Sequence, residues 1–383
     1  MKPTAEPMPL SDAPTERISP TAPIDLVYLW VDGADPKFRA LKRRHLSAST
    51  GHSERDDLTG DDARYRQIGE IAYSVRSVRR FAPWIRDIHI VVAPGQRPPV
   101  DLDDPRIHIV EHPQIMPAAI LPTFSNRSIE PFVHRIPGLS EVFLYANDDF
   151  LFWRNTPREH FVVDGELSLR GRFLPRWRAR TGAVLHEGHS RTVSQTALRL
   201  YDHGLRRVFR AEHSFHVMRR TTCETVWREC GAFLDRVVAL RFRNDELGAN
   251  WQMLVNGFEL RDRSPRTVRT FDTVLLSFAH VEESRATAAL VRMRLALLRW
   301  FAPRTMCFNT IPASWSDRVR AVLDRHYGPI DPPRRDAVVA MAKREPGDPA
   351  TPIDGSAKFA GSSRGAVAAD DRVRDRTSPR QRS

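Results

Sequence analysis

Short continuous apolar runs and helix-period patterns alternate along the first part of the chain. Residues 24–31, 88–94, 105–112 and 142–146 are apolar runs of the length expected for strands that are covered on both faces. Between the first two runs, residues 62–87 place apolar side chains at helical spacing, and a proline within this range predicts where the helix ends. Strands separated by helix-length segments predict an α/β fold with a largely parallel sheet.

The second half of the chain has a less regular pattern. Residues 212–230 predict a loop that enters a helix, the latter part of 241–260 predicts another helix, and 306–328 predict a strand, a turn and a helix. Residues 287–303 contain arginines among their apolar positions, so we expect an amphipathic or buried helix there and not a membrane span.

Both ends of the chain are rich in Pro, Gly, Ser and charged residues and have few large apolar ones. Such composition cannot bury enough apolar surface to offset the entropy of ordering the chain. We therefore expect disordered segments at 1–22 and 336–383, the latter basic, and one domain at 23–335.

The composition narrows the class of protein. The chain has 383 residues, 41% of them hydrophobic, and can bury a full core. Its net charge of +12 favours anionic partners such as nucleic acid, phosphorylated substrates or an acidic lipid surface. Three cysteines without a CxxC pair favour a reducing compartment, and the N-terminal residues lack the pattern of a secretory signal. We expect a cytoplasmic protein with peripheral contact at the inner face of a membrane.

Polar residues follow three of the predicted strands. The stretch "FLYANDDFLF" (143–152) places Asp148 and Asp149 directly after a buried strand, "WVDGADP" places Asp32 and Gly33 after the first, and "PGQ" follows the second. In open α/β sheets, ligands bind outside the carboxyl ends of the strands. We therefore expect these residues to share one site.

The adjacent acids require compensation, because burying a carboxylate pair is costly without a cation, a proton or several donors. In an ideal strand Asp148 and Asp149 point to opposite faces, so both can address one cation only if the strand ends there. They would then hold Mg²⁺ or Mn²⁺ through oxygen, with a substrate diphosphate completing the shell. Alternatively, one acid caps the next turn and the other is solvated.

Arginines and histidines supply further candidates. Arg66 and Arg76 belong to the predicted helix and suit phosphate, although an exposed helix with a pair between Arg66 and Glu70 explains them equally well. His213 and His216 are three residues apart, but no third metal ligand is fixed by the sequence. We favour a general base or a substrate hydrogen bond over zinc, against the ordinary alternative of structural histidines.

Taken together, these segments resemble the Stealth family, which includes bacterial capsular polysaccharide phosphotransferases and the catalytic subunit of the lysosomal-enzyme N-acetylglucosamine-1-phosphotransferase. "IDLVYLWVDGADP" resembles its first conserved region. The elements "APWIR", "LPTFSN", "HRIPGLSE" and "NDD", in this order, resemble its long second region. We expect the four conserved regions at about 24–36, 62–165, 210–260 and 304–330.

The later regions carry further roles over by resemblance. "EHSFHVMRRTTCETVWREC" with "FRNDEL" is similar to the third region, whose histidine role falls on His213, with His216 as competitor. Its arginine role falls on Arg243, with the nearby Arg241 as the alternative. The fourth region usually reads Cys-x-Asn-Asp, whereas "CFNT" keeps Asn309 and has Thr310 at the position of the aspartate. This departure leaves a non-catalytic member of the family as an alternative.

The resemblance implies a Rossmann-like, glycosyltransferase-A-like fold and a phosphotransferase. It implies transfer of a hexose or N-acetylhexosamine 1-phosphate from a nucleotide sugar, expected to be UDP-linked, to a hydroxyl of a capsular or exopolysaccharide. A phosphodiester forms and a nucleoside monophosphate leaves. The base is His213, Asp32 or another carboxylate.

The predicted metal ligands are Asp148 and Asp149. The predicted catalytic residues are Asp32, Asp149, His213 and Arg243. The predicted substrate-binding residues are Trp30, Gly33, Arg66, Glu70, Arg76, Thr123, Ser125, Asn126, Glu130, His134, Arg135, His216 and Asn309.

Two other functions stay open. A metal-dependent glycosyltransferase would use a similar acidic site but would break the sugar–oxygen bond and release a nucleoside diphosphate. A basic nucleic-acid-binding protein would account for the net charge, but it gives no reason for acids at the end of a buried strand.

Overall fold

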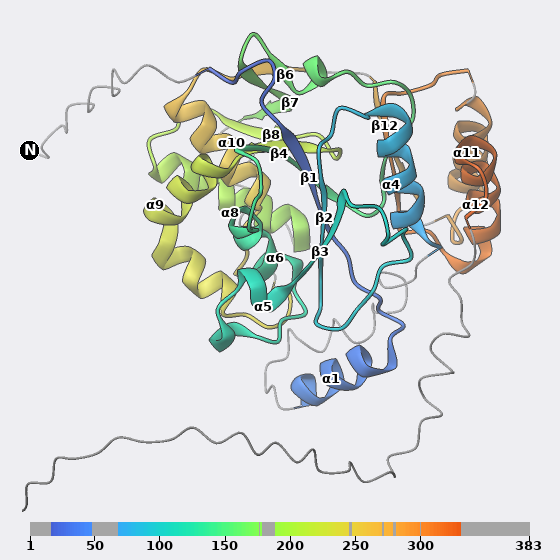
Figure 1. The fold of residues 1–383 in the computed structure, drawn as a ribbon, viewed down its shortest axis with the longest axis horizontal. Coiled ribbons are helices and arrows are strands. Elements are labelled where there is room, and N and C mark those ends of the chain that lie inside the picture. Colours follow the sequence, from blue (N-terminus) through green and yellow to red (C-terminus); the bar gives the residue numbers. More distant parts are fainter. Residues whose placement is uncertain are drawn as a thin grey trace, which may run out of the picture. The chain divides into compact units, whose positions relative to one another are not determined.

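The computed structural model describes residues 17–47, 68–175, 177, 188–244, 247–269, 272–278, 281–298 and 300–330 (Figure 1). The described elements belong to one compact unit.

The central sheet has five strands in the order β3-β2-β1-β4-β9. β1 (Ile24–Leu29), β2 (Ile88–Val92), β3 (Ile107–Glu111) and β4 (Val142–Asn147) are parallel, and β9 (His216–Arg219) runs antiparallel to β4. The predicted α/β class with a mostly parallel sheet is confirmed. β2 and β3 lie on one side of β1 and β4 on the other, so the order reverses between β1 and β4, which is where such sheets bind ligands.

β1, β2 and β4 are buried on both faces, which explains why they are continuous apolar runs in the sequence. Their alternate side chains enter two different cores. Val27, Phe143 and Tyr145 face the first core, and Tyr28 and Leu144 face the second.

Helices cover both faces of this sheet, and Figure 1 shows α5, α6, α8, α9 and α10 on one side and α4 on the other. The first side is formed by α5 (His112–Ile115), α6 (Asn126–Ile129), the 3-10 helix η3 (Glu130–Arg135), α8 (Gly188–Asp202), α9 (Arg220–Val238) and α10 (Trp251–Asp262). The second side is covered by α4 (Glu70–Phe81).

Two smaller sheets extend the second side. The first has the order β11-β12-β5 and consists of β5 (Phe150–Phe152), β11 (Thr273–Ser277) and β12 (Thr305–Asn309), with α11 (Arg285–Leu297) and α12 (Ala313–Tyr327) packed in the same core. The other consists of β6 (Val162–Val163), β7 (Glu166–Leu174), β8 (Val208–Ala211) and β10 (Arg266–Val268). The remaining elements are α1 (Pro36–Ser47), η2 (Ala118–Ile120) and η4 (Arg158–His160).

The helix predicted over 62–87 is α4, which ends before Pro83 as expected; residues 62–67 lie outside the described ranges. The region predicted as a loop before a helix contains β9, whose four residues are too few to show a strand period. α11 is the helix predicted within 287–303. No helix in the described part of the chain is long and apolar enough to cross a membrane.

The N-terminal segment predicted to be disordered (1–22) extends too far along the chain. Ile18 is buried, and its N–H donates to the carbonyl oxygen of Gly165 at 2.9 Å, so the chain is packed from at least this point. The rest of the segment predicted to be disordered at the N-terminus (1–16) and the whole predicted C-terminal segment lie outside the described residues.

Candidate active site

β4 ends in a turn that carries two carboxylates. Asp148 and Asp149 form the turn between β4 and β5, and the chain becomes strand again at Phe150. The prediction that the strand ends at this pair is confirmed. Because the chain turns here, the two side chains are freed from the alternation that would send them to opposite faces.

The carboxylate of Asp149 is only half satisfied. Its Oδ2 accepts a hydrogen bond from the thiol of Cys307 at 3.1 Å, while its buried Oδ1 has no hydrogen-bond partner among the described residues. Burial and then the charge of Asp148 raise the pKa of Asp149 to about 7, against the opposite effect of the Cys307 hydrogen bond. A buried oxygen in this state calls for a proton or a cation.

A third acid lies close to this pair. Glu70 is the first residue of α4, is buried, and accepts the N–H of Ile68 at 2.8 Å. Burial, followed by the charge of Asp148, raises the pKa of Glu70 to about 8, and Asp149 adds to the effect. Since the amino end of a helix favours negative charge, α4 partly offsets this concentration of acids.

The fourth conserved region lies beside the acidic turn. β12 pairs with β5 in antiparallel register, with Cys307 opposite Phe150, and the N–H of Phe308 donates to the carbonyl oxygen of Asp149 at 3.3 Å. Continued by two residues, this register brings Asn309 opposite Asp148. Sequence reasoning did not assign Cys307 a role, although its position two residues before Asn309 on a strand puts both on one face.

Thr310 follows with an unusual backbone. Its φ is 60°, in the left-handed region, and its hydroxyl donates to Oδ1 of Asn309 at 2.9 Å. A β-branched residue adopts this conformation at a cost, whereas Asp and Asn tolerate it better. The aspartate expected at this position therefore also suits the backbone.

Both predicted histidines reach the same edge of the sheet. His216 pairs with Tyr145 near the end of β4, and His213 packs edge-on against Phe150 with ring centroids 4.8 Å apart. His213, Asp149 and Cys307 each offer a possible ligand atom within 4.8 Å of the others. Burial raises the pKa of the Cys307 thiol well above its usual value, so it donates to Asp149 as a thiol.

The two histidines differ in access to solvent. His213 is exposed and His216 is partly buried. Although the side chain of His213 is exposed, the protein packed around its ring partly desolvates it and, with Arg210 adding, lowers its pKa. Burial, with His213 adding, lowers the pKa of His216 to about 3. Both rings are neutral at neutral pH, and His213 is the one that a substrate can reach as a proton acceptor.

A chain of hydrogen bonds holds Arg243 near the end of β4. Nε and Nη2 of Arg243 donate to Oδ1 of Asn126 at 3.2 and 3.1 Å, and Nδ2 of Asn126 donates to Oε1 of Glu130 at 3.2 Å. The same Oε1 accepts the hydroxyl of Tyr145 at 3.0 Å. Burial raises the pKa of Glu130, which Tyr145 and Arg243 oppose. Sequence reasoning missed Tyr145, which is hidden within an apolar strand.

Arg241, the alternative to Arg243 in the third region, supports a loop instead. Its Nη1 donates to the carbonyl oxygen of Pro122 at 2.8 Å, and its own carbonyl accepts the hydroxyl of Thr123 at 3.4 Å. Oγ1 of Thr123 accepts the N–H of Ser125 at 3.3 Å. Thr123 and Ser125 therefore hold the loop that positions Asn126.

The loop after β1 lies beside the acidic turn, because Leu29 pairs with Asn147. Oδ1 of Asp32 accepts the N–H of Ala34 at 2.9 Å, and Gln96 bonds both the N–H and the carbonyl of Asp32, each at 3.0 Å. These contacts give Asp32 a part in shaping the loop. In the same loop, the side chain of Trp30 is buried and Gly33 is partly exposed.

Arg76, on the same helix as Glu70, bonds the end of α12. Its Nη1 donates to three carbonyl oxygens at the end of α12, those of Tyr327, Gly328 and Pro329, at 3.3, 2.9 and 2.9 Å. These contacts give Arg76 a structural part in supporting a helix end, and its part in substrate binding stays a prediction.

His134 and Arg135 are separated from the acidic turn. They line a cavity with Leu139, which precedes β4, and Arg220, which follows β9. Both neighbours mark the amino end of β4, the opposite edge of the sheet. The structure therefore places these two residues at the edge of the sheet opposite the acidic turn, and their part in substrate binding stays a prediction. The remaining predicted residue, Arg66, lies outside the described ranges.

The fold and this edge define an α/β protein with a carboxylate-rich site at the switch point of its sheet. Two family models match the chain: Stealth protein CR1, conserved region 1, over residues 22–49, and Stealth protein CR2, conserved region 2, over residues 64–169. The capsular polysaccharide phosphotransferase LcbA of Aeromonas hydrophila is 31% identical over 287 residues, which cover 67% of this chain and 75% of LcbA. The chain belongs to the Stealth family.

Other similarities are more partial. The exopolysaccharide phosphotransferase SCO2594 of Streptomyces coelicolor is 40% identical over 148 residues, which are 38% of this chain and only 24% of that protein. The match thus spans about a quarter of that relative. A solved structure of the galactosyltransferase LgtC with donor and acceptor sugar analogues is 11% identical, with a TM-score of 0.39, and covers 79% of this chain and 96% of LgtC. The α/β assignment rests on the strand order described above.

Proposed function

We propose that this chain transfers a sugar 1-phosphate from a nucleotide sugar to a hydroxyl of a capsular or exopolysaccharide. The names of its relatives support polysaccharide phosphotransfer. The observation that carries the proposal is Oδ1 of Asp149, buried at the switch point of the sheet without a hydrogen bond from the described residues. A nucleotide sugar brings a diphosphate, whose charge such a site can manage only together with a cation.

The residues present fit a divalent cation. Asp148 and Asp149 would hold it, since the thiol of Cys307 occupies Oδ2 of Asp149 and leaves Oδ1 for a ligand. The raised pKa values of Asp149 and Glu70 report an excess of negative charge that a cation would offset. Carboxylate oxygens favour Mg²⁺ or Mn²⁺ over softer metals. Such an ion neutralises charge on the diphosphate of the donor.

His213 is the proposed general base. It is neutral and exposed at the edge that carries the acidic turn, so it can accept the proton of the acceptor hydroxyl. The hydroxyl oxygen then bonds to the phosphorus attached to the sugar. The bond from that phosphorus to the bridging oxygen breaks, and this oxygen leaves on the nucleoside monophosphate.

Arg243 and the loop after β1 complete the assignment. Arg243, which Asn126 orients, offsets charge on the phosphoryl oxygens in the transition state. The loop that contains Trp30, Asp32 and Gly33 is fixed by Gln96. It binds the nucleotide of the donor, which we take to be UDP.

The product identifies the reaction. Purified protein is incubated with UDP-N-acetylglucosamine or UDP-glucose, Mg²⁺ and an oligosaccharide acceptor, and the nucleotide released is identified by chromatography. Release of UMP supports phosphotransfer. Release of UDP would instead establish the glycosyltransferase alternative.

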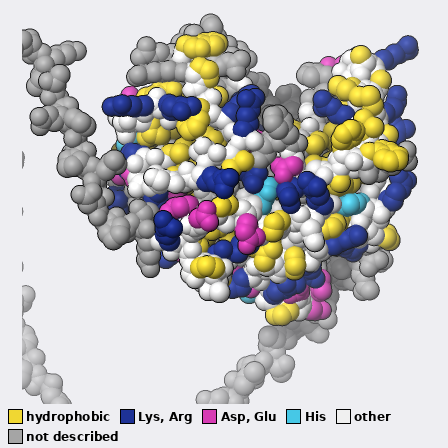
Figure 2. All heavy atoms as spheres, turned by 90° about the horizontal axis from the view of Figure 1, so that it is seen from above, with side chains coloured by type: hydrophobic (Ala, Val, Ile, Leu, Met, Phe, Trp, Pro, Cys, Tyr) yellow, Lys and Arg dark blue, Asp and Glu magenta, His cyan; other side chains and the backbone are white. Residues whose placement is uncertain are grey.

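We also propose that α11 contacts an anionic membrane, where a growing polysaccharide can be presented. Its inner face is buried through Ala288, Val291 and Leu295. A second apolar stripe is exposed and consists of Leu290, Met293, Leu297, Trp300 (72% exposed) and Phe301 (73% exposed). Arg292 and Arg294 are exposed beside it, and Figure 2 shows hydrophobic and basic side chains gathered over the part that carries α11 and α12. An apolar stripe with arginines and terminal aromatics is typical of helices that lie in a lipid interface.

Vesicle binding tests this contact. Co-sedimentation with vesicles containing phosphatidylglycerol should be lost in Trp300→Glu with Phe301→Glu and kept in Leu102→Glu, which alters an exposed leucine elsewhere. Equal binding by both proteins, or equal binding to neutral vesicles, would contradict an anionic membrane as the partner.

A further inference from the structure

The cavity at the amino end of β4 is separate from the acidic site. It has a volume of about 640 Å³, within the range of ordinary ligand pockets. β4 has six residues, which correspond to about 20 Å of strand between its two ends. The cavity and the acidic turn therefore lie at opposite edges of the same sheet.

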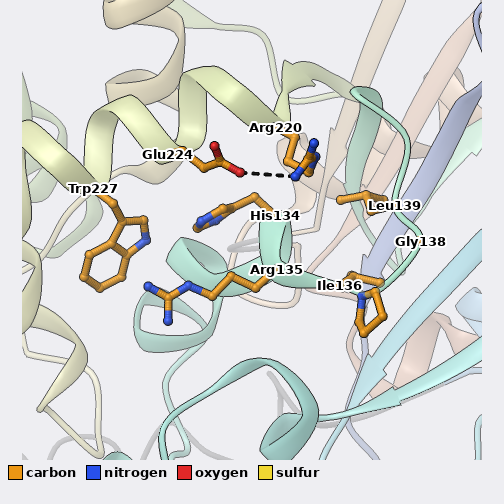
Figure 3. A pocket seen from close by; sticks show the side chains of 9 residues that line it. His134, Arg135, Ile136, Gly138, Leu139, Arg220, Glu224 and Trp227 are labelled. Atoms are coloured by element: carbon orange, nitrogen blue, oxygen red, sulfur yellow. Dashed lines mark hydrogen bonds and ion pairs between the residues drawn. The ribbon is translucent and has the colours of Figure 1, made fainter.

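Three side chains from successive turns of α9 form one wall. Arg220, Glu224 and Trp227 are spaced so that they share one face of the helix. Figure 3 shows His134 and Arg135 extending toward this wall from η3. The indole N–H of Trp227 donates to the carbonyl oxygen of Pro131 at 2.6 Å, which fixes the ring.

Arg135 presents its polar edge toward solvent. Its guanidinium lies over the ring of Phe132 at 4.8 Å and over that of Trp227 at 5.1 Å, and the side chain is exposed. Stacking orders the planar guanidinium while leaving its N–H groups available around the rim. Such a preorganised fork binds phosphate at a low entropic cost.

The remaining polar groups are unevenly satisfied. Arg220 pairs with Glu224, with 3.2 Å between Nη1 and Oε1, and its Nε, which has no hydrogen bond within the described ranges, lies 3.8 Å from Oε2 of Glu141. The buried Nδ1 of His134 has no hydrogen-bond partner in the same ranges. Burial, with Arg135 and Arg220 adding, lowers the pKa of His134 to about 4, so the imidazole is neutral between two cations. The cavity thus offers donors of positive charge, one carboxylate, a neutral imidazole and aromatic surface.

This combination fits a charged glycan better than a simple anion. Sugar hydroxyls both donate and accept, which Glu224 and His134 can match, while a phosphodiester accepts from Arg135 and Arg220. Aromatic surface suits the apolar faces of sugar rings. We propose that this cavity binds the phosphodiester-linked chain of the acceptor polysaccharide at a distance from the reacting end. The proposal rests on the proposed function for the identity of the glycan.

One continuous segment links the cavity to the active site. Asn126 and Glu130 bond the groups at the carboxyl end of β4, and Arg135 ends the same segment at the cavity. A glycan of several units that occupies both places would be retained between transfers. Long acceptors should then be used better than short ones.

Direct binding tests the site without catalysis. Isothermal titration calorimetry compares the wild-type full chain with a double variant that carries both Arg135→Gln and Arg220→Gln. The ligand is an oligosaccharide of N-acetylhexosamine 1-phosphate units joined by phosphodiesters. The double variant should bind about tenfold or more weakly, since two charge-assisted contacts are lost. The matched control is Arg228→Gln, an exposed arginine of α9 outside the cavity, which should bind as wild type does. Arg135→Gln alone, on an exposed side chain, is used if the double variant does not fold.

The comparison ligands decide between outcomes. Equal affinity of the wild type and the cavity variants overturns the site, as does equal binding of a neutral dextran oligosaccharide or full competition by equimolar inorganic phosphate. UMP release with a short acceptor is measured separately. If no UMP is released but the affinity difference holds, the proposed function is wrong and the glycan site is supported. If UMP is released but wild type and variants bind the glycan equally, the glycan site is wrong and the proposed function is supported.

Discussion

The two edges of the central sheet both bury carboxylates, but they satisfy them differently. At the amino edge, Asp25 is fully buried and accepts Nε and Nη2 of Arg86 at 2.8 and 2.5 Å and the N–H of Ser140 at 2.7 Å. Burial would raise the pKa of Asp25, but the ring of His89 at 3.6 Å and hydrogen bonds from Arg86 and Ser140 outweigh it and hold this pKa well below its usual range.

At the carboxyl edge the balance is reversed. Asp149 receives one thiol hydrogen bond, and its pKa is raised to about 7. Glu70, beside it, has a pKa raised to about 8. The fold thus supplies the partners of Asp25, whereas it leaves Asp149 and Glu70 with raised pKa values that an added cation would lower. The contrast separates a structural acid from acids that bind a ligand.

Replacing Asp149 with Asn should have the largest effect on turnover. It removes a proposed cation ligand, and we expect nucleoside monophosphate release to fall by about a thousandfold or more. The fold should be retained, because the amide removes a charge that the protein leaves poorly compensated. Initial rates give the first quantity and a urea melt the second.

The result would contradict the assignment if turnover survived, or if Asp149→Asn unfolded the protein. The latter would make this carboxylate as structural as Asp25.

Asp25→Asn should show the opposite behaviour. The buried carboxylate is lost as the charged acceptor of Ser140 and Arg86, while Arg86 itself is exposed and keeps Asp87 at 3.0 Å, so we expect the free energy of unfolding to fall by about 2 kcal/mol. Because the pKa of Asp25 is lowered in the folded state, its contribution is full above the ordinary aspartate pKa of about 4 and is lost as pH falls toward the folded value.

Urea melts of wild type and Asp25→Asn at pH 7 and at pH 3 measure this difference. It should be smaller at the lower pH, and the specific activity of the variant's folded fraction should match that of wild type. A pH-independent difference would mean that packing, and not charge, is what Asp25 contributes.

Adding Mg²⁺ or Mn²⁺ should raise the free energy of unfolding only in proteins that keep Asp149. A cation at 100 times its Kd raises the free energy of unfolding by about 2.7 kcal/mol if it binds the folded state alone. We expect this gain in wild type and in Asp25→Asn, and its loss in Asp149→Asn. Thermal melts with either metal and with EDTA give the comparison; equal stabilisation of all three proteins would place the cation elsewhere.

The sequence predicts the acidic edge because its signal is local. Two acids directly after a buried strand identify the end of β4, and continuous apolar runs predict the parallel sheet. The thiol of Cys307, which donates a hydrogen bond to Asp149, lies on β12, 158 residues away in sequence. His213 reaches the site through β9, a strand too short to show a period. No local pattern reports such pairings, since they depend on how separate elements pack.

The same reason explains why the sequence alone did not locate Arg76, His134 and Arg135 in the fold. Arg76 has the spacing of a surface arginine, and only the position of α12 shows that its guanidinium caps a helix end. His134 and Arg135 follow Glu130 closely in sequence, yet η3 runs away from the acidic turn and delivers them to the other edge. Proximity in sequence to a site residue therefore did not imply proximity to the site.

The smallest effect is expected at Thr310, where the acidic edge departs from the family pattern. With φ at 60°, a β-branched side chain costs about 1 kcal/mol relative to residues that tolerate the left-handed region. Thr310→Asp and Thr310→Asn should both raise the free energy of unfolding by about this amount, because they share shape and backbone preference. They differ only in charge. If a carboxylate here takes part in the reaction, turnover should rise in Thr310→Asp and not in Thr310→Asn. Equal turnover in wild type and both variants would show that the aspartate usual in the family only suits the backbone conformation.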